Sequence, residues 1–273
     1  MPITFSSQSL ASVLDSSTTA WIAQVVTNGG TVSDARAAVV DEFIRGLKAD
    51  GLWTKQERLW LLAAENSQSA LTDIVGLTLA IANGSPTFTT DQGYTGVDAS
   101  TTVYLDTGWN PPGATLFAQD SAHISIYSNT NTTSSASGGC PYGLTFQPAQ
   151  IGIFIRYSDG TLRPRINDTT LSTNATNADS RGFYIVNRDT STTEQVYKNG
   201  VNYASNGTTS APDTSTDNIF ILAGNSSNSG PVSPAFGSAI QVSMAGLGSS
   251  LSAADAVNFY KRVRSYVTAI GIP

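Results

Sequence analysis

Short alternating segments, separated by residues that form turns, constrain the fold of this chain more than any other feature. They occupy most of residues 84–250. Ile151 and Ile153, for example, recur at every second position, as expected when one face of a strand points into a core. Asn199 and Gly200, within VYKNGVNYA, are the preferred pair for a two-residue type I′ hairpin turn, because both central residues need a positive φ. Several strands at spacings of roughly 8–12 residues indicate a β-sandwich or barrel.

The preceding region has a different composition and a helical pattern. Residues 31–73 include 12 charged residues in 43, whereas residues 84–250 include 17 in 167. Apolar residues follow Ser33 at spacings of three and four, which places them on one stripe of a helix. Ser33 is a favourable N-cap, and Gly51 supplies the left-handed residue that ends many helices. We therefore predict a helix between Ser33 and Gly51.

Three more helices are expected in this first region. One surrounds Trp21. Another begins at Thr54, because Glu57 stands three residues later and the pair forms a capping box. A third, shorter helix begins at Ser67. Together these elements predict a small helical domain over residues 1–83.

A final helix follows the strands. Ser252 and Asp255 form a capping box, apolar residues continue at helical spacing, and Gly271 can close the helix. The predicted fold class is α+β. A helical domain over residues 1–83 precedes a domain over residues 84–273, which is an antiparallel β-sandwich with a C-terminal helix.

The net charge and the scarcity of cysteine and histidine argue against several classes of function. The net charge is −6, the pI is about 4.6 and only 14 residues are Lys or Arg, so we expect no nucleic-acid partner. No apolar run approaches the length of a membrane span, and we expect no membrane partner. The chain has one cysteine, Cys140, and one histidine, His123. An intramolecular disulfide is therefore impossible, and we expect no metal site built from histidine and cysteine ligands.

The acidic residues do not form the pattern that glycoside cleavage requires. Two carboxyl groups must face each other across the bond, about 5–5.5 Å apart for retention or about 6.5–9.5 Å for inversion. Beyond Glu65 the only glutamate is Glu194, and no two aspartates are arranged as Asp-x-Asp. There is also no Gly-x-Ser-x-Gly elbow for a serine nucleophile. We therefore predict no catalytic residues and no enzymatic activity.

Calcium is the one cofactor that the sequence leaves open. Residues 187–192 and 213–218 are rich in Asp, Asn, Ser and Thr, whose oxygens could bind the ion. The same residues also stabilise turns, and we favour that role. The expectation is no cofactor and no metal.

The order of the later segments resembles concanavalin A-like and laminin G-like jelly rolls. In these proteins a Tyr-x-Asn-Gly hairpin comes late in the sandwich, then an alternating apolar strand, and then a Leu-Ser-x-x-Asp helix start. The resemblance covers residues 85–271. The matching residues here are Tyr197, Asn199, Gly200, Ile219, Ile221, Leu222, Ile240, Val242, Leu251, Ser252, Asp255 and Tyr260.

The front of the chain is similar to the segment that precedes such jelly rolls in bacteriophage virion proteins. The similarity covers residues 51–76 and 85–109. It implies a non-enzymatic structural virion protein, a capsid decoration or a tail or fibre component, in which the helical part attaches and the sandwich is displayed. The implied partners are other virion proteins, with self-association into a homo-oligomer and a host surface glycan as a further partner. The chain would be made in the bacterial cytoplasm and reside in the virion, since its start lacks the features of a secretory signal. The alternative is a carbohydrate-binding or glycan-depolymerising surface module.

Two aromatic residues are the candidates for sugar contact. Sandwiches of this kind stack an exposed ring on the sugar and orient its hydroxyls with Asp or Asn. Trp109 and Tyr142 stand in segments rich in turn residues, which favours exposure. Aromatic residues more commonly serve hydrophobic cores, and that role remains the competing interpretation for both.

Overall fold

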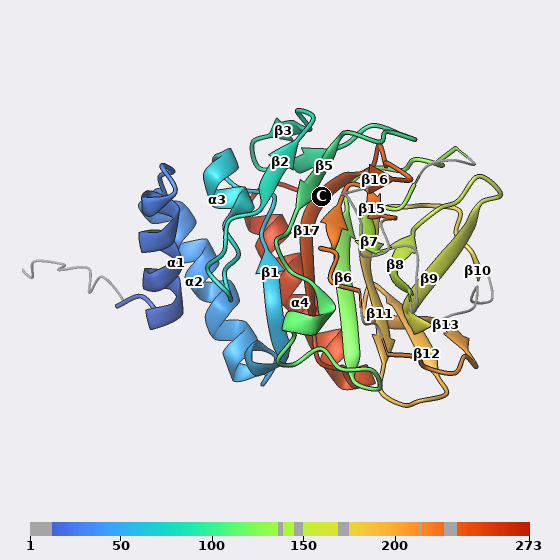
Figure 1. The fold of residues 1–273 in the computed structure, drawn as a ribbon. Coiled ribbons are helices and arrows are strands. Elements are labelled where there is room, and N and C mark those ends of the chain that lie inside the picture. Colours follow the sequence, from blue (N-terminus) through green and yellow to red (C-terminus); the bar gives the residue numbers. More distant parts are fainter. Residues whose placement is uncertain (1–12, 136–138, 145–149, 169–174, 213–214, 227–233) are drawn as a thin grey trace, which may run out of the picture.

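The fold consists of two β-sheets and a layer of helices, as shown by a computed structural model (Figure 1). The structure describes residues 13–135, 139–144, 150–168, 175–212, 215–226 and 234–273. The fold class predicted from the sequence, an antiparallel β-sandwich with an N-terminal helical region and a C-terminal helix, is confirmed. Across the described ranges, no helix is both long and apolar enough to cross a membrane.

The first sheet contains the hairpin that the sequence predicted. Asn199 and Gly200 have φ values of 53° and 77°, as a type I′ turn requires. The sheet is antiparallel, and its central strand β17 pairs with β6 on one side and with both β1 and β4 on the other. In spatial order the strands are β13 (Val201–Asn206), β12 (Glu194–Lys198), β11 (Gly182–Arg188), β6 (Ala122–Ser128), β17 (Gln241–Gly248), β1 (Gln56–Trp60) together with β4 (Gly93–Thr95), and β3 (Thr87–Thr89).

The second sheet lies against the inner face of the first. Most of its pairs are antiparallel, and β15 pairs with β7 in parallel. Its strands in order are β10 (Ala175–Thr176), β9 (Thr161–Asp168), β8 (Gln150–Phe154), β7 (Tyr142–Leu144), β14 (Phe220–Ile221), β5 (Tyr104–Asp106) and β2 (Ile81–Asn83), with β15 (Gly224–Asn225) and β16 (Pro234–Ala235) beside them.

The helices begin at the caps that the sequence indicates. The Ser33 side chain accepts the Arg36 N–H, and Ser252 and Asp255 form a complete capping box. The α-helices are α1 (Ser16–Thr27), α2 (Asp34–Ala49), α3 (Ser67–Leu71) and α4 (Ala253–Ala269), and the 3₁₀ helices are η1 (Trp53–Lys55) and η2 (Pro111–Gly113).

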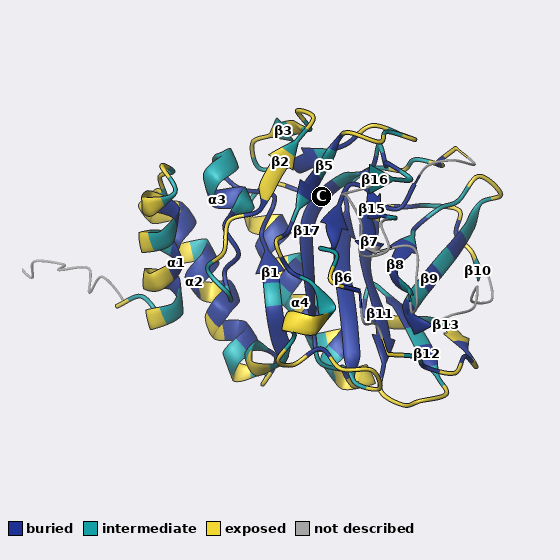
Figure 2. Cartoon of the chain, viewed as in Figure 1, coloured by how far each residue is buried: buried dark blue, intermediate teal, exposed yellow. Residues whose placement is uncertain are grey.

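Alternation along the first sheet creates two separate cores. Figure 2 shows that β6, β11 and β17 are buried along almost their whole length. On β11, Tyr184 and Val186 point into the core between the sheets, where they join Ile153. Their neighbours Phe183 and Ile185 point the other way, into the core beneath α2 and α4. The first sheet is therefore the middle layer, covered by helices on one face and by the second sheet on the other.

The helix expected to begin at Thr54 is wrong. After a single 3₁₀ turn, residues 56–60 form β1, which pairs with β17 from Gln56 opposite Gly248 to Trp60 opposite Ala245. The capping-box pattern was misleading, because Glu57 bonds to a distant loop rather than to its own helix start. The segment 1–83 is thus not wholly helical, and it supplies a central part of the sandwich.

Candidate functional site

Trp109 lies inside the molecule rather than on a binding surface. Its side chain is 3% exposed, and its ring packs edge-on against Phe117 with centroids 5.4 Å apart. The indole N–H donates to Glu57 Oε1 at 3.3 Å. The expectation of an exposed ring is therefore wrong for Trp109, and the core interpretation is correct.

Glu57 explains why the segment around Trp109 turns inward. Its carboxylate also accepts the backbone N–H groups of Thr115, Leu116 and Phe117 at 2.8–2.9 Å. Burial alone would raise the pKa of Glu57, but these backbone bonds outweigh burial and hold the pKa below its ordinary value. One side chain of β1 thus fixes the loop that carries Trp109.

Tyr142 is also buried. It lies on β7 in the core between the sheets, and burial raises the pKa of its hydroxyl well above the ordinary value. Neither candidate ring can stack on a sugar at the surface. The residues next to Trp109 and Tyr142 in the sequence do not indicate this burial, because it depends on residues far away in the chain.

The polar cavity that the structure does present borders the predicted hairpin. We call it the hairpin pocket. It is a surface cavity of about 390 Å³ where the end of β6 and the start of β11 meet α4. Its lining residues are Tyr127, Ser128, Asn129, Asp179, Arg181, Gly182, Asn199, Tyr260, Arg264 and Pro273.

Asn199 has a fixed orientation in this pocket. Its side-chain oxygen accepts the Phe183 N–H at 2.9 Å. A Cβ atom at residue 182 would lie 2.7 Å from that same oxygen, so Gly182 is needed for the approach. The amide nitrogen of Asn199 donates to no residue in the described part of the chain. The sequence singled out this residue only as a turn former.

Arginine side chains supply the charge in the hairpin pocket. Arg181 binds both carboxylate oxygens of Asp179, with Nε 3.1 Å from Oδ1 and Nη2 2.7 Å from Oδ2, and these bonds lower the pKa of Asp179 to about 2. Arg264 donates through Nη1 to the Tyr127 hydroxyl at 3.0 Å and to the main-chain oxygen of Pro273 at 2.8 Å. The pocket thus combines an aromatic ring, Tyr260, with several N–H donors, a combination suited to small polar ligands.

Buried carboxylates elsewhere serve the fold. Asp73 accepts the backbone N–H groups of Leu59, Val75 and Gly76, and burial raises its pKa to about 6. Glu194, the only glutamate of the later region, is fully buried and accepts the Asn206 amide at 3.0 Å. These groups hold loops and strands in place.

Neither His123 nor Cys140 is placed as a reactive group. Burial lowers the pKa of His123 to about 4, and its Nδ1 contacts the carbonyl of Ser249. Burial raises the pKa of the Cys140 thiol to about 12, and the thiol donates to the carbonyl of Tyr142.

The structure describes only part of the two segments, 187–192 and 213–218, that could have supplied calcium ligands. Asn187 uses its side-chain oxygen to accept the Leu251 N–H, while residues 213 and 214 lie outside the described residues. Within the described ranges, no three His, Cys, Asp or Glu residues gather as a metal site.

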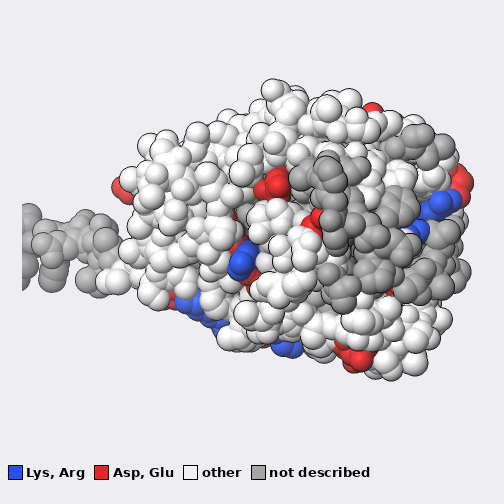
Figure 3. Space-filling view, viewed as in Figure 1, with Lys and Arg blue, Asp and Glu red and all other residues white. Residues whose placement is uncertain are grey.

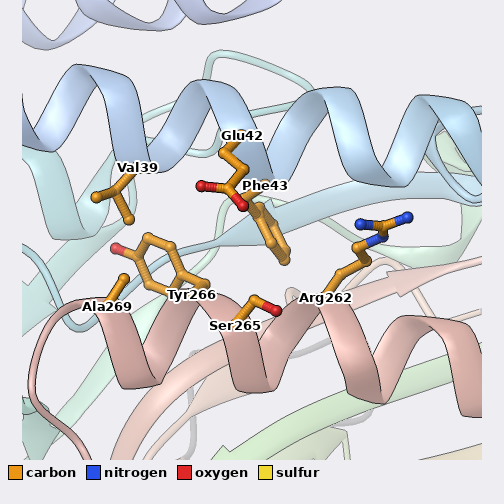
Figure 4. A pocket seen from close by; sticks show the side chains of 7 residues that line it. All are labelled: Val39, Glu42, Phe43, Arg262, Ser265, Tyr266 and Ala269. Atoms are coloured by element: carbon orange, nitrogen blue, oxygen red, sulfur yellow. The ribbon is translucent and has the colours of Figure 1, made fainter.

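The helical layer offers a second surface. Figure 4 shows a groove between α2 and α4, with Glu42 and Phe43 on one side and Arg262 and Tyr266 on the other. Arg262 crosses α2 at Gly46 to reach Asp50, with Nε 2.7 Å from Oδ2. On the face shown in Figure 3, the coloured charges are few and scattered.

Comparisons with known proteins reveal a shared fold. No family model matches the chain, and no curated protein matches it in sequence. Among solved structures, it is similar to a Trypanosoma rangeli sialidase in complex with 2,3-difluorosialic acid, with 10% identity and a TM-score of 0.50. That match covers 82% of this chain and 39% of the sialidase. It is also similar to the binding domain of botulinum neurotoxin serotype D, with 11% identity, a TM-score of 0.52, and coverage of 77% and 52%. At these identities the likeness shows an antiparallel β-sandwich and nothing further.

Proposed function

We propose that this chain is a non-enzymatic structural protein of a bacteriophage virion, which displays its lectin-like sandwich and attaches through its helical layer. The capsid, the tail and the fibre are all compatible with this role. One structural observation supports it most. The buried carboxylates Glu57, Asp73 and Glu194 bond to the fold itself, so they are committed to architecture rather than to a reacting group.

The proposal is tested on particles of the phage that encodes the chain. Purified virions are analysed by quantitative mass spectrometry, and a cryo-EM map locates the chain. We expect a fixed copy number per particle and no release of reducing ends from host polysaccharide by the purified protein. Absence from particles, or turnover of a polysaccharide, contradicts the proposal.

Self-association through α2 is part of this proposal. The exposed positions of this helix include Ala38, Glu42, Arg45 and Ala49, which follow one another along one stripe. A two-fold axis between residues 43 and 44 would bring Glu42 of each copy to Arg45 of the other, and the small Ala38 to Ala49. Glu42 makes no hydrogen bond or salt bridge among the described residues, although its charge acts on Arg262. The Arg45 side chain is 50% exposed and pairs with Asp41 on its own helix. The surface is therefore complementary in charge to a second copy of itself.

Carbohydrate recognition is the second candidate function, and the hairpin pocket favours it. Several side-chain donors converge there around Tyr260 in a cavity large enough for a sugar ring. A glycan array tests it directly. Binding of a defined glycan supports this function, and an array without binding rejects it.

A further inference from the structure

The hairpin pocket contains unused hydrogen-bond donors but no unused side-chain carboxylate. The Asn199 amide is the best-defined donor. The Phe183 N–H needs an acceptor, so it holds the side-chain oxygen of Asn199, and the NH₂ group must face the other way. No described residue accepts from that NH₂ group. A ligand in the pocket therefore meets a donor at this position.

Two arginines add to the excess of donors. Arg264 uses Nη1 for Tyr127 and Pro273, and its Nε and Nη2 donate to no described residue. Arg181 uses Nε and Nη2 for Asp179, which leaves Nη1 without a described acceptor. A guanidinium group with free N–H donors is a favourable partner for a carboxylate, because charge-assisted bonds are the stronger ones.

The one acidic side chain of the pocket is already used. The Asp179 carboxylate accepts the backbone N–H of Arg181 as well as its guanidinium. Neutral sugars are commonly recognised through carboxylates and amides that accept their hydroxyl protons. Among the described residues of the lining, the only carboxylate side chain is engaged, and the remaining amide acceptor is the side-chain oxygen of Asn129, whose NH₂ group donates to Gln92 and Gln241. The pocket instead favours a ligand that brings the acceptors itself.

Size and shape argue for more than a simple anion. A cavity of about 390 Å³ falls within the range of small-molecule sites, and a phosphate ion would leave most of it empty. Tyr260 lies half-buried in the lining beside Gly200, and its ring is the aromatic group on which the apolar face of a pyranose would pack.

From these four features we infer that the hairpin pocket binds a pyranose sugar that carries a carboxylate. The acid group would lie near Arg264 and Arg181, and a ring oxygen or hydroxyl would accept from Asn199. This inference rests on the second candidate function, carbohydrate recognition, and adds the class of sugar and its site.

Matched pairs of sugars test the inference with the full chain. Galacturonate and galactose differ only in the acid group, as do glucuronate and glucose. Binding is measured by saturation-transfer NMR and calorimetry, with inorganic phosphate as a third probe. We expect at least one uronate to bind more tightly than its neutral parent by about tenfold or more, as one charge-assisted bond implies.

A nearly isosteric variant tests the site. Asn199→Asp keeps the oxygen that accepts the Phe183 N–H and tolerates the positive φ, but it replaces the free donor with a negative oxygen. We expect at least about tenfold weaker uronate binding. Asn202→Asp, an exposed position on the same hairpin, makes the same change in charge and should leave the affinity unchanged.

The possible failures separate the inference from the proposed function. Equal binding of acid and neutral sugars, or phosphate binding as tight as the uronate, overturns the inference about the ligand. Uronate binding that survives Asn199→Asp overturns the inference about the site. If no uronate binds while a glycan array identifies a neutral glycan, the inference is wrong and carbohydrate recognition stands.

Discussion

Replacing Glu57 should destabilise the protein strongly. The side chain is 5% exposed, and its carboxylate accepts three backbone N–H groups and the Trp109 indole. Hydrogen bonds to a charged group contribute about 1.5–3 kcal/mol each, but bonds that share one carboxylate are not additive. Glu57→Ala leaves four donors without that acceptor, and we expect a loss of about 4 kcal/mol in the free energy of unfolding. Glu57→Gln keeps one acceptor oxygen and should cost about 2 kcal/mol.

Urea unfolding followed by tryptophan fluorescence measures this loss. A change of about 4 kcal/mol also corresponds to a fall in Tm of roughly 10 °C for a chain of this size. Asp189→Asn is the control, because Asp189 is exposed just after β11 and its replacement should change stability by less than about 0.5 kcal/mol. If Glu57→Ala costs under about 1 kcal/mol, the carboxylate does not hold the loop as described.

The pH dependence provides an independent check on Glu57. Because the folded-state pKa is depressed, the stabilising contribution is present above the unfolded-state pKa and is lost as pH falls through the folded-state value. The native chain should therefore lose this contribution in acid. Glu57→Gln should show a smaller loss over the same interval, and parallel curves for the two proteins would argue against the proposed cause.

Three further predictions concern other parts of the fold. Burial raises the pKa of Asp73 to about 6, so between about pH 4 and 6 the folded state binds more protons than the unfolded state. The free energy of unfolding should therefore rise as pH falls from 7 to 5, and Asp73→Asn should remove this rise in urea titrations. Gly200→Ala places a Cβ atom 3.1 Å from the Cα of Val257 at a φ of 77°, and should lower the free energy of unfolding by about 1–3 kcal/mol. The control Gly207→Ala places its Cβ atom where no atom lies within 4 Å, and should lower it by under about 1 kcal/mol in the same assay. Glu42→Arg and Arg45→Glu should each shift the sedimentation profile toward monomer and the double variant should restore association; a profile unaffected by either single change argues against the α2 surface.

Local sequence signals predicted the elements whose determinants are local. The Asn199-Gly200 turn and the Ser252–Asp255 capping box depend on residues within a few positions, and both formed as expected. The helix after Ser33 was predicted for the same reason. The hairpin turn and the C-terminal helix α4 both border the hairpin pocket.

Signals between distant residues were not visible in the sequence. β1 is a strand because it pairs with β17, which lies far away in the sequence. The local pattern of Thr54 and Glu57 predicted a helix instead. Trp109 is buried because its indole N–H and the backbone of the same loop donate to Glu57, which is distant in the sequence. The hairpin pocket brings together residues from 127 to 273, and of these the sequence patterns had indicated only Asn199 and Tyr260.

The placement of β17 has a consequence for biosynthesis. This strand occupies the middle of the first sheet, yet it is the last strand that the ribosome delivers. Until it emerges, β6 and β1 each lack a neighbour, although both were translated long before. Such pairing over long chain separations is slow, because the entropy of closing the loop must be lost before contacts form. In the nascent polypeptide β6 and β1 therefore stay unpaired along the edges that β17 will occupy, and we expect the first sheet to be completed only after translation of residue 248.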